Sequence, residues 1–131
     1  MTVHVWPIRV YYEDTDLAGV VYHANHLKFI ERARSEMVRA HGIDQAAMRE
    51  DGIVFAVHTM EANWIRPAHY DDELVVTTRV TAVSAARFFL SQIITRGETT
   101  IFEATVTIAC MTVAGRPVRL PETVRRMVTK D

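Results

Sequence analysis

Residues 11–42 read YYEDTDLAGVVYHANHLKFIERARSEMVRAHG, an acidic loop followed by an amphipathic helix. The loop holds three carboxylates in four positions, Glu13, Asp14 and Asp16, and Gly19 follows them. A helix predicted to begin near Asn25 presents free backbone N–H groups and the positive end of its dipole there. Such a helix start stabilises negative charge, including charge that develops during a reaction. We therefore interpret an acid of the loop and the helix start as a candidate hydrolytic pair.

The helix is predicted from its period, because apolar and histidine side chains recur at helical spacing on one side. Asn25 is expected as the N-cap, and Gly42 as the left-handed residue that ends the helix. The buried side is predicted to hold His26, Phe29, Ile30, Ala33, Met37, Ala40 and His41. The solvent side is predicted to hold Lys28, Glu31, Arg32, Ser35, Glu36 and Arg39.

Composition indicates an ordinary globular chain. It has 131 residues, 24% charged and 49% apolar, with a formal net charge of −1. A single domain over residues 1–131 is expected, and nothing favours disorder or a nucleic-acid partner. The single cysteine, Cys110, excludes an internal disulfide and a Cys-based zinc site. It lies among β-branched residues, as a buried structural thiol does, and fits a reducing compartment.

No segment is predicted to enter a membrane. The longest stretch without Asp, Glu, Lys or Arg is residues 104–115, too short to span a bilayer. The N-terminal residues lack a basic region followed by an apolar core and a cleavage site. We therefore expect a soluble cytoplasmic protein.

The rest of the chain is predicted to form strands. Residues 2–12 form a first strand, and Pro7 within it favours a sheet edge or a bulge. A short helical turn follows over residues 43–52. Long alternating or apolar runs then predict strands at 54–65, 74–83, 87–96 and 100–113, the last two joined by a tight turn at Gly97-Glu98. In the first of these, one face is predicted to hold Val54, Ala56, His58, Met60, Ala62 and Trp64.

These elements predict an α+β fold in which an antiparallel sheet of about five strands curls round one long helix. Several strands are apolar on both sides, so the sheet has more apolar surface than one helix can cover. A homodimer or a homotetramer built as a dimer of dimers is therefore expected.

Residues 12–26, YEDTDLAGVVYHANH, closely resemble the active-site loop and helix start of hotdog-fold acyl-CoA thioesterases. The resemblance is strongest to the 4-hydroxybenzoyl-CoA thioesterase class and its Tol-Pal-associated branch. Residues 66–74, RPAHYDDEL, resemble the second loop of that family. The resemblance implies a hotdog fold, dimerised through the sheets, that hydrolyses an acyl-CoA thioester at the subunit interface.

By this resemblance, Asp16 corresponds to the catalytic carboxylate, acting as general base for water or as nucleophile. His23 stands where the family places a backbone oxyanion donor, and Tyr12 corresponds to a tyrosine linked to activity in the Tol-Pal-associated branch. No metal or organic cofactor is implied, and coenzyme A enters as part of the substrate. Leu17 and His26 depart from the family pattern and leave the acyl preference open.

Other interpretations of the same residues remain to be weighed. Asp14, Asp16 and Gly19 match positions of a calcium loop, but Ala18 and Asn25 occupy two ligand positions and exclude it. A metal site from Asp16 and the two histidines at the helix start has no clear support. Asp14 is predicted to stabilise the loop. Packing roles for the rings of Tyr12 and His23 also stay open.

The rival function is a non-catalytic hotdog domain that binds acyl thioesters or acts as an interaction scaffold, because one fold hosts many functions. A carboxylate beside a thioester carbonyl has little use in a binding module, which favours the enzyme. A hotdog dehydratase is less favoured, because those enzymes resemble a different motif built around a histidine.

Overall fold

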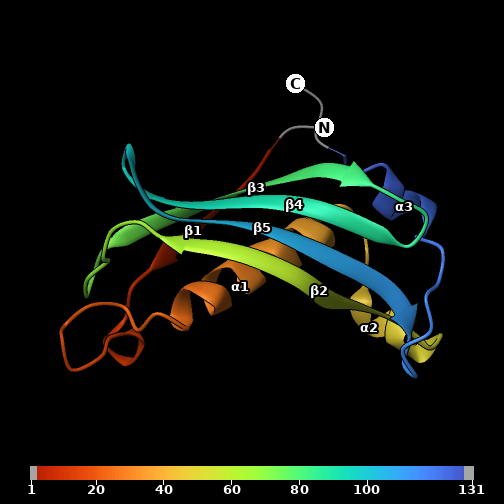
Figure 1. The fold of residues 1–131 in the computed structure, drawn as a ribbon, viewed down its shortest axis with the longest axis horizontal. Helices are drawn as coiled ribbons and strands as arrows, with labels where there is room; N and C mark the ends of the chain where they lie inside the picture. The colour runs from red at the N-terminus through yellow and green to blue at the C-terminus, as the bar shows by residue number, and fades with distance from the viewer. Residues whose placement is uncertain (1–2, 129–131) are drawn as a thin grey trace.

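The computed structural model describes residues 3–128, in which five strands form one sheet wrapped over a long helix (Figure 1). The sheet order is β1-β3-β4-β5-β2, with every neighbouring pair antiparallel. The elements are β1 (His4–Arg9), η1 (Tyr12–Asp14), α1 (Asn25–Ala40), α2 (Gln45–Glu50), β2 (Ile53–Trp64), β3 (Glu73–Val83), β4 (Arg87–Arg96), β5 (Thr99–Thr112) and α3 (Glu122–Arg125). The predicted α+β hotdog arrangement is confirmed, and so is the place of Pro7 on an edge strand.

Helix α1 buries most of the stripe expected from its period, but Ala40, His41, which follows the helix end and is partly buried, and the N-cap differ from the prediction. Its buried side chains are His26, Phe29, Ile30, Ala33, Met37 and Val38. Ala40 is exposed, because the buried face at this end of the helix passes through Val38 instead. Ala24 occupies the N-cap position without a side-chain bond, so the prediction that Asn25 caps the helix is wrong. Gly42, with φ +80°, ends the helix as expected.

Strands β3, β4 and β5 alternate between buried and less buried residues, as a sheet with one covered face requires. Strand β2 does not keep one alternation along its length. Its pairing with β5 shifts between Val57 and Thr59, which leaves an extra residue at His58. Phe55 therefore packs on the core before this bulge, and Met60 and Ala62 pack on it after the bulge. The single face predicted from Val54 to Trp64 is wrong for the first half of the strand.

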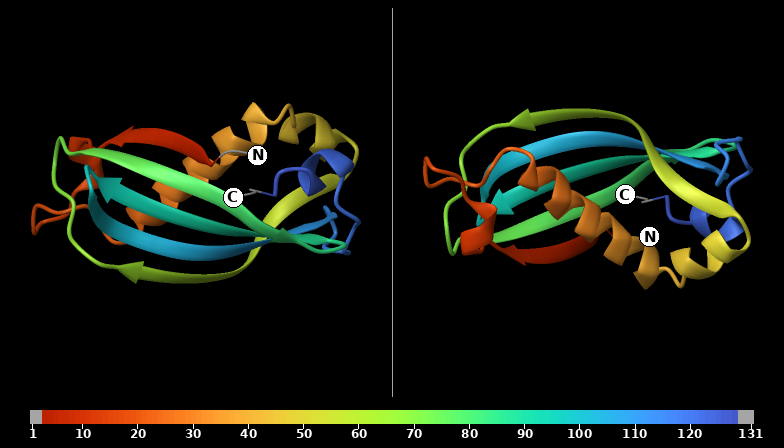
Figure 2. Two further views of the ribbon diagram at one scale, coloured as in Figure 1. Left: turned by 90° about the horizontal axis from the view of Figure 1, so that it is seen from above. Right: turned by 90° about the horizontal axis from the view of Figure 1, so that it is seen from below.

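The core lies between α1 and the concave face of the sheet. Viewed from below, α1 crosses that face diagonally and α2 continues beyond it (Figure 2). Phe29 and Ile30 of α1 meet a sheet face that includes Phe88, Leu90 and Phe102, all at most 1% exposed. In the part of the chain that the structure describes, no helix is long and apolar enough to cross a membrane.

The strand order determines where the chain crosses the sheet. Strands β2 and β3 are consecutive in sequence but lie on opposite sides of the β4–β5 pair. The connection over residues 65–72 must therefore pass across one end of the sheet. At that end it lies against the acidic loop, because the Val21 N–H donates to the Ala68 carbonyl at 2.8 Å. The two sequence segments that resemble the thioesterase motifs thus meet at one place.

Candidate active site

Asp14 holds the acidic loop to the helix start. Its carboxylate accepts a hydrogen bond from the Tyr11 N–H at 2.8 Å, and its carbonyl accepts one from the Tyr22 N–H at 2.9 Å. The side-chain amide of Asn25 donates to the same carbonyl, also at 2.9 Å. With 8% of its surface exposed, Asp14 stabilises the loop, as the sequence predicts.

Asp16 lies at the turn of the loop, and its side chain is exposed. Its Oδ1 accepts a hydrogen bond from the Ala18 N–H at 2.9 Å, and its carbonyl accepts one from the Gly19 N–H at 3.0 Å. Gly19 has φ +81°, a conformation that glycine adopts without steric cost, and this lets the chain turn back. Among residues 3–128 the second oxygen, Oδ2, has no hydrogen-bond partner. The turn therefore fixes the carboxylate and leaves one oxygen free.

His23 lies just before α1 and its backbone N–H is a free donor. Within the described residues this N–H makes no hydrogen bond. The first N–H groups of a helix have no partner inside the helix, and the positive end of the helix dipole lies among them. The region before Asn25 can therefore stabilise an oxygen that gains negative charge.

The carbonyl of His23 is bound by two side chains that the sequence did not single out for this role. Trp64, at the end of β2, donates its Nε1–H to this carbonyl at 2.9 Å. The Nδ1 of His26 lies 3.3 Å from the same oxygen. The His26 ring stacks on Phe102, with centroids 5.3 Å apart, and burial lowers its pKa below the ordinary histidine value. Two rings from different elements thus fix the peptide that follows His23.

Tyr12 begins the short helical turn η1, and its backbone supports the loop. Its carbonyl accepts a hydrogen bond from the Thr15 hydroxyl at 3.0 Å. The residue is 85% exposed, so the ring does not pack beneath the loop. The packing role considered for Tyr12 is therefore excluded. Asp16 and His23 lie on the two arms of one small hairpin, since Thr15 pairs with Val21, and Tyr12 lies at its base.

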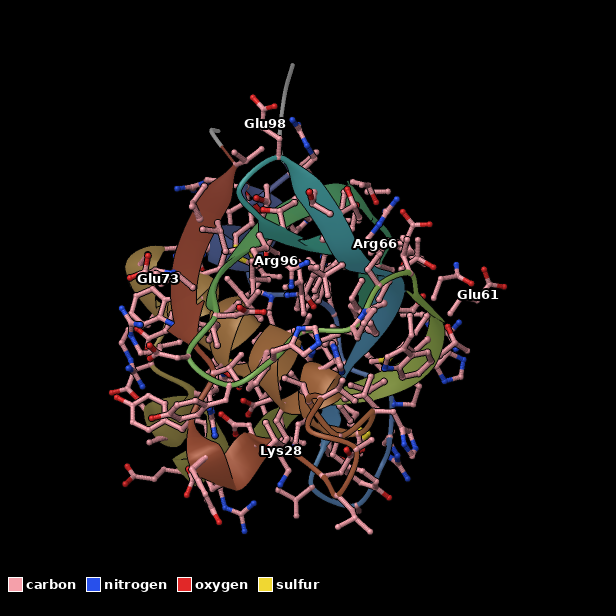
Figure 3. All side chains as sticks on the ribbon, turned by 90° about the vertical axis from the view of Figure 1, so that its left-hand side faces the viewer. Lys28, Glu61, Arg66, Glu73, Arg96 and Glu98 are labelled. Carbon is pink, nitrogen blue, oxygen red and sulfur yellow. The ribbon has the colours of Figure 1, made fainter. Side chains whose placement is uncertain are left out.

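The crossing segment over residues 65–72 is itself held by Asp72. The Asp72 carboxylate accepts hydrogen bonds from the His69 N–H and from Arg96, both at 2.8 Å. Desolvation acts to raise the pKa of Asp72, but these two donors outweigh it and lower the pKa below its ordinary value. Figure 3 looks onto this end, where Arg96 comes from β4, Arg66 from the crossing segment and Lys28 from α1. The same view shows acidic side chains at this end as well, among them Glu61 and Glu73, so positive and negative groups are mixed there.

No resident metal is indicated by the geometry of the described residues. Across residues 3–128, no three His, Cys, Asp or Glu side chains are grouped closely enough to hold an ion. The chemistry available at the loop is that of a carboxylate, a free N–H and a helix start.

Comparisons with known proteins agree with this geometry. Residues 10–128 match the family model of the thioesterase-like superfamily. The acyl-CoA thioester hydrolase YbgC of Escherichia coli O6:H1 is 41% identical over 111 residues, which covers 84% of this chain and 83% of that protein. The acyl-CoA thioesterase YbgC of Haemophilus influenzae is 39% identical over 122 residues, 92% of this chain and 90% of that protein.

Solved structures give the same result. The crystal structure of a probable thioesterase from Bartonella henselae has a TM-score of 0.87 and 42% identity. The match covers 92% of this chain and 100% of that protein's chain. A hypothetical protein from Aquifex aeolicus has a TM-score of 0.88 and 25% identity, over 95% of this chain and 98% of that one. Sequence and fold agree over nearly the whole length, and the chain belongs to the thioesterase-like superfamily.

Proposed function

We propose that this chain is an acyl-CoA thioesterase, which hydrolyses an acyl-CoA to a free acid and coenzyme A. The observation that carries the proposal is the exposed Asp16 carboxylate, held by its turn on the loop that leads into the free N–H of His23. The relatives named as acyl-CoA thioester hydrolases support the substrate class. Coenzyme A takes part as a portion of the substrate, and the reaction requires no resident metal or organic cofactor.

In this proposal, Asp16 either removes a proton from the water that attacks the thioester carbonyl carbon, or attacks that carbon itself to form an acyl–Asp16 anhydride, which water then hydrolyses to the free acid and the Asp16 carboxylate. The carbonyl oxygen gains negative charge as the new bond forms. The His23 N–H and the α1 dipole stabilise that charge. The C–S bond then breaks, and coenzyme A leaves as a thiolate that takes up a proton. A thioester is reactive enough for this set of groups to act without a Ser/His/Asp triad.

Tyr12 is proposed to position the loop. Its carbonyl accepts a hydrogen bond from the hydroxyl of Thr15, the residue immediately before Asp16. Its exposed ring is then available to cover a bound substrate. The role of Tyr12 is thus separate from the proton transfer assigned to Asp16.

A homodimer or homotetramer is also part of the proposal. Strand β2 is a sheet edge of 12 residues, whereas the other edge strand, β1, has 6 residues and carries Pro7. A long edge exposes a row of unpaired N–H and C=O groups that another strand can bind. Val57 and Trp64 on β2 are 47% and 46% exposed. We therefore assign β2 as the strand through which two copies pair. A cytoplasmic location, where the buried thiol of Cys110 stays reduced, completes the proposal.

The decisive experiment measures free coenzyme A released from a panel of short, medium, long and aromatic acyl-CoAs by wild type and Asp16→Asn. Asparagine keeps the side-chain oxygen that accepts the Ala18 N–H, so the turn is retained. Loss of the base or nucleophile should lower kcat about 100- to 10,000-fold. An Asp16→Asn variant as fast as wild type would refute the assignment. Binding of acyl-CoA without turnover in either protein would support the acyl-binding domain instead.

A further inference from the structure

A small pocket lies between α1 and the first half of β2, apart from the acidic loop. Its volume is about 130 Å³, close to that of an engineered apolar cavity that binds benzene, about 150 Å³. One wall is apolar and the other, on α1, is polar. The apolar wall includes Phe55, Val57, Phe88 and Ile108, and the polar side is lined by Arg34 and Ser35 with the exposed Glu31 and Gln45 at its rim.

Arg34 is the unusual residue of this pocket, because its guanidinium is half-buried and poorly paired. Its closest hydrogen-bond acceptor among residues 3–128 is Gln92 Oε1, at the long distance of 3.4 Å. No carboxylate in that range forms an ion pair with it, although Glu31 lies near enough to attract its charge. Burial lowers the pKa of Arg34. A guanidinium has five N–H donors, and among residues 3–128 only Gln92 accepts a hydrogen bond from this one.

Gln92 holds Arg34 at the pocket. Gln92 is fully buried at 0% exposure, and its amide nitrogen donates to the Ile30 carbonyl at 2.9 Å and to the Thr78 hydroxyl at 3.0 Å. Both N–H groups of the amide are used, so its oxygen points toward Arg34 and cannot turn away. A polar group fixed inside the core thus presents an acceptor to the guanidinium at the edge of the pocket.

We propose that Arg34 determines specificity, by binding a hydrogen-bond acceptor, above all a carboxylate, at the far end of the acyl group. A planar guanidinium binds a carboxylate through two parallel hydrogen bonds, and the bond is stronger in a desolvated site. The pocket volume limits the rest of the acyl group to a ring or a short chain. The substrate class is therefore an acyl-CoA with a compact acyl group that ends in a carboxylate or a similar acceptor.

The inference rests on the proposed function and on the pairing of two copies through β2. Arg34 lies nine residues after Asn25, about 14 Å along the helix, which is too far for a compact acyl group held at the same chain's loop. In a two-fold antiparallel pair, the first half of one β2 lies beside the second half of the other. Trp64 ends β2 and binds His23. The helix start of one copy therefore lies beside the Arg34 pocket of the other.

The test compares acyl-CoAs of equal shape that differ only at the far end. Terephthaloyl-CoA is paired with 4-isopropylbenzoyl-CoA, and adipoyl-CoA with 6-methylheptanoyl-CoA, because an isopropyl group is similar in size to a carboxylate and has neither charge nor hydrogen-bond acceptor. Wild type should favour the carboxylate member in kcat/KM by about 10- to 100-fold, the range for a hydrogen bond to a charged group. Arg34→Met should abolish this preference, mainly through KM, and Arg34→Lys should keep part of it.

Arg116→Met is the matched control, since Arg116 is exposed on the turn after β5, away from the pocket. It should keep the wild-type ratio. Equal kcat/KM for both members in wild type, or an unchanged ratio in Arg34→Met, overturns the inference. Binding of non-hydrolysable thioether analogues of the same pairs, measured by calorimetry, gives the ratio even without turnover. A failure of hydrolysis can thus be told apart from a failure of the Arg34 assignment.

Discussion

Trp64→Phe removes one hydrogen bond at the helix start while keeping a ring in place. The Trp64 indole donates to the His23 carbonyl at 2.9 Å, and its ring packs edge-on against Phe102 with centroids 5.3 Å apart. Phenylalanine preserves the aromatic contact and lacks the donor. The substitution therefore tests whether this bond positions the peptide at the proposed oxyanion site.

The expected loss follows from the geometry. A neutral hydrogen bond contributes about 0.5–1.5 kcal/mol net. His26 Nδ1 still lies 3.3 Å from the same carbonyl, and Trp64 is 46% exposed, so water can replace part of the lost bond. A loss of about 1 kcal/mol in the transition state lowers kcat about fivefold. KM should stay within about twofold, because the bond acts on the proposed oxyanion site rather than on the acyl or coenzyme A portions.

The assay is release of free coenzyme A over a full range of acyl-CoA concentrations for Trp64→Phe, wild type and Trp6→Phe. Trp6 is the matched control, because it is the other of the two tryptophans and lies on β1 at the opposite sheet edge. Trp6→Phe should keep the wild-type kcat. The reasoning is refuted if Trp64→Phe has the wild-type kcat, or if its loss is entirely in KM.

Three further substitutions test other contacts. Asp14→Ala leaves the Tyr11 N–H without its acceptor and should lower the free energy of unfolding by about 1–3 kcal/mol in denaturant titrations; an unchanged midpoint would contradict the anchoring role. Gln92→Leu removes the donor that binds the Thr78 hydroxyl and the Ile30 carbonyl. It should lower the free energy of unfolding by about 2–4 kcal/mol in the same titrations. Burial lowers the pKa of His26, so the unfolded chain binds the proton first as pH falls below about 6.5. Wild type should lose stability below that pH, and thermal unfolding of His26→Phe should show a weaker pH dependence.

Much of the fold can be predicted from the sequence, because helices and strands follow from the local spacing of apolar residues. The stripe from His26 to Met37 predicts α1, and Gly42 marks its end by a conformation that glycine favours. The sequence does not predict the bulge at His58, because a strand with one extra residue is as rich in strand-forming residue types as a regular strand. Asn25 was assigned as a cap from residue type alone, but its amide serves the carbonyl of Asp14. That contact exists only because the loop folds back on the helix.

The site was only partly predictable for a similar reason. Asp16 and His23 lie in one continuous segment, so a motif can reveal them. The contact from Trp64 to His23 joins residues 41 positions apart, and it depends on where β2 ends in space. The helical period assigns Arg34 to neither the buried nor the solvent side of the helix. Only the packing of α1 on β2 and on buried Gln92 shows that it lines a pocket.

The crossing of residues 65–72 past the acidic loop has a consequence for how the protein folds. Strands β4 and β5 are neighbours in sequence and can pair early, whereas β1 must find β3 across most of the chain, for example His4 with Thr78. Distant pairings form slowly, because the entropy of closing a long loop is lost first. The contact of Val21 with Ala68 also joins distant parts of the chain. During refolding, we therefore expect the site to form with these distant pairings and after the local β4–β5 hairpin.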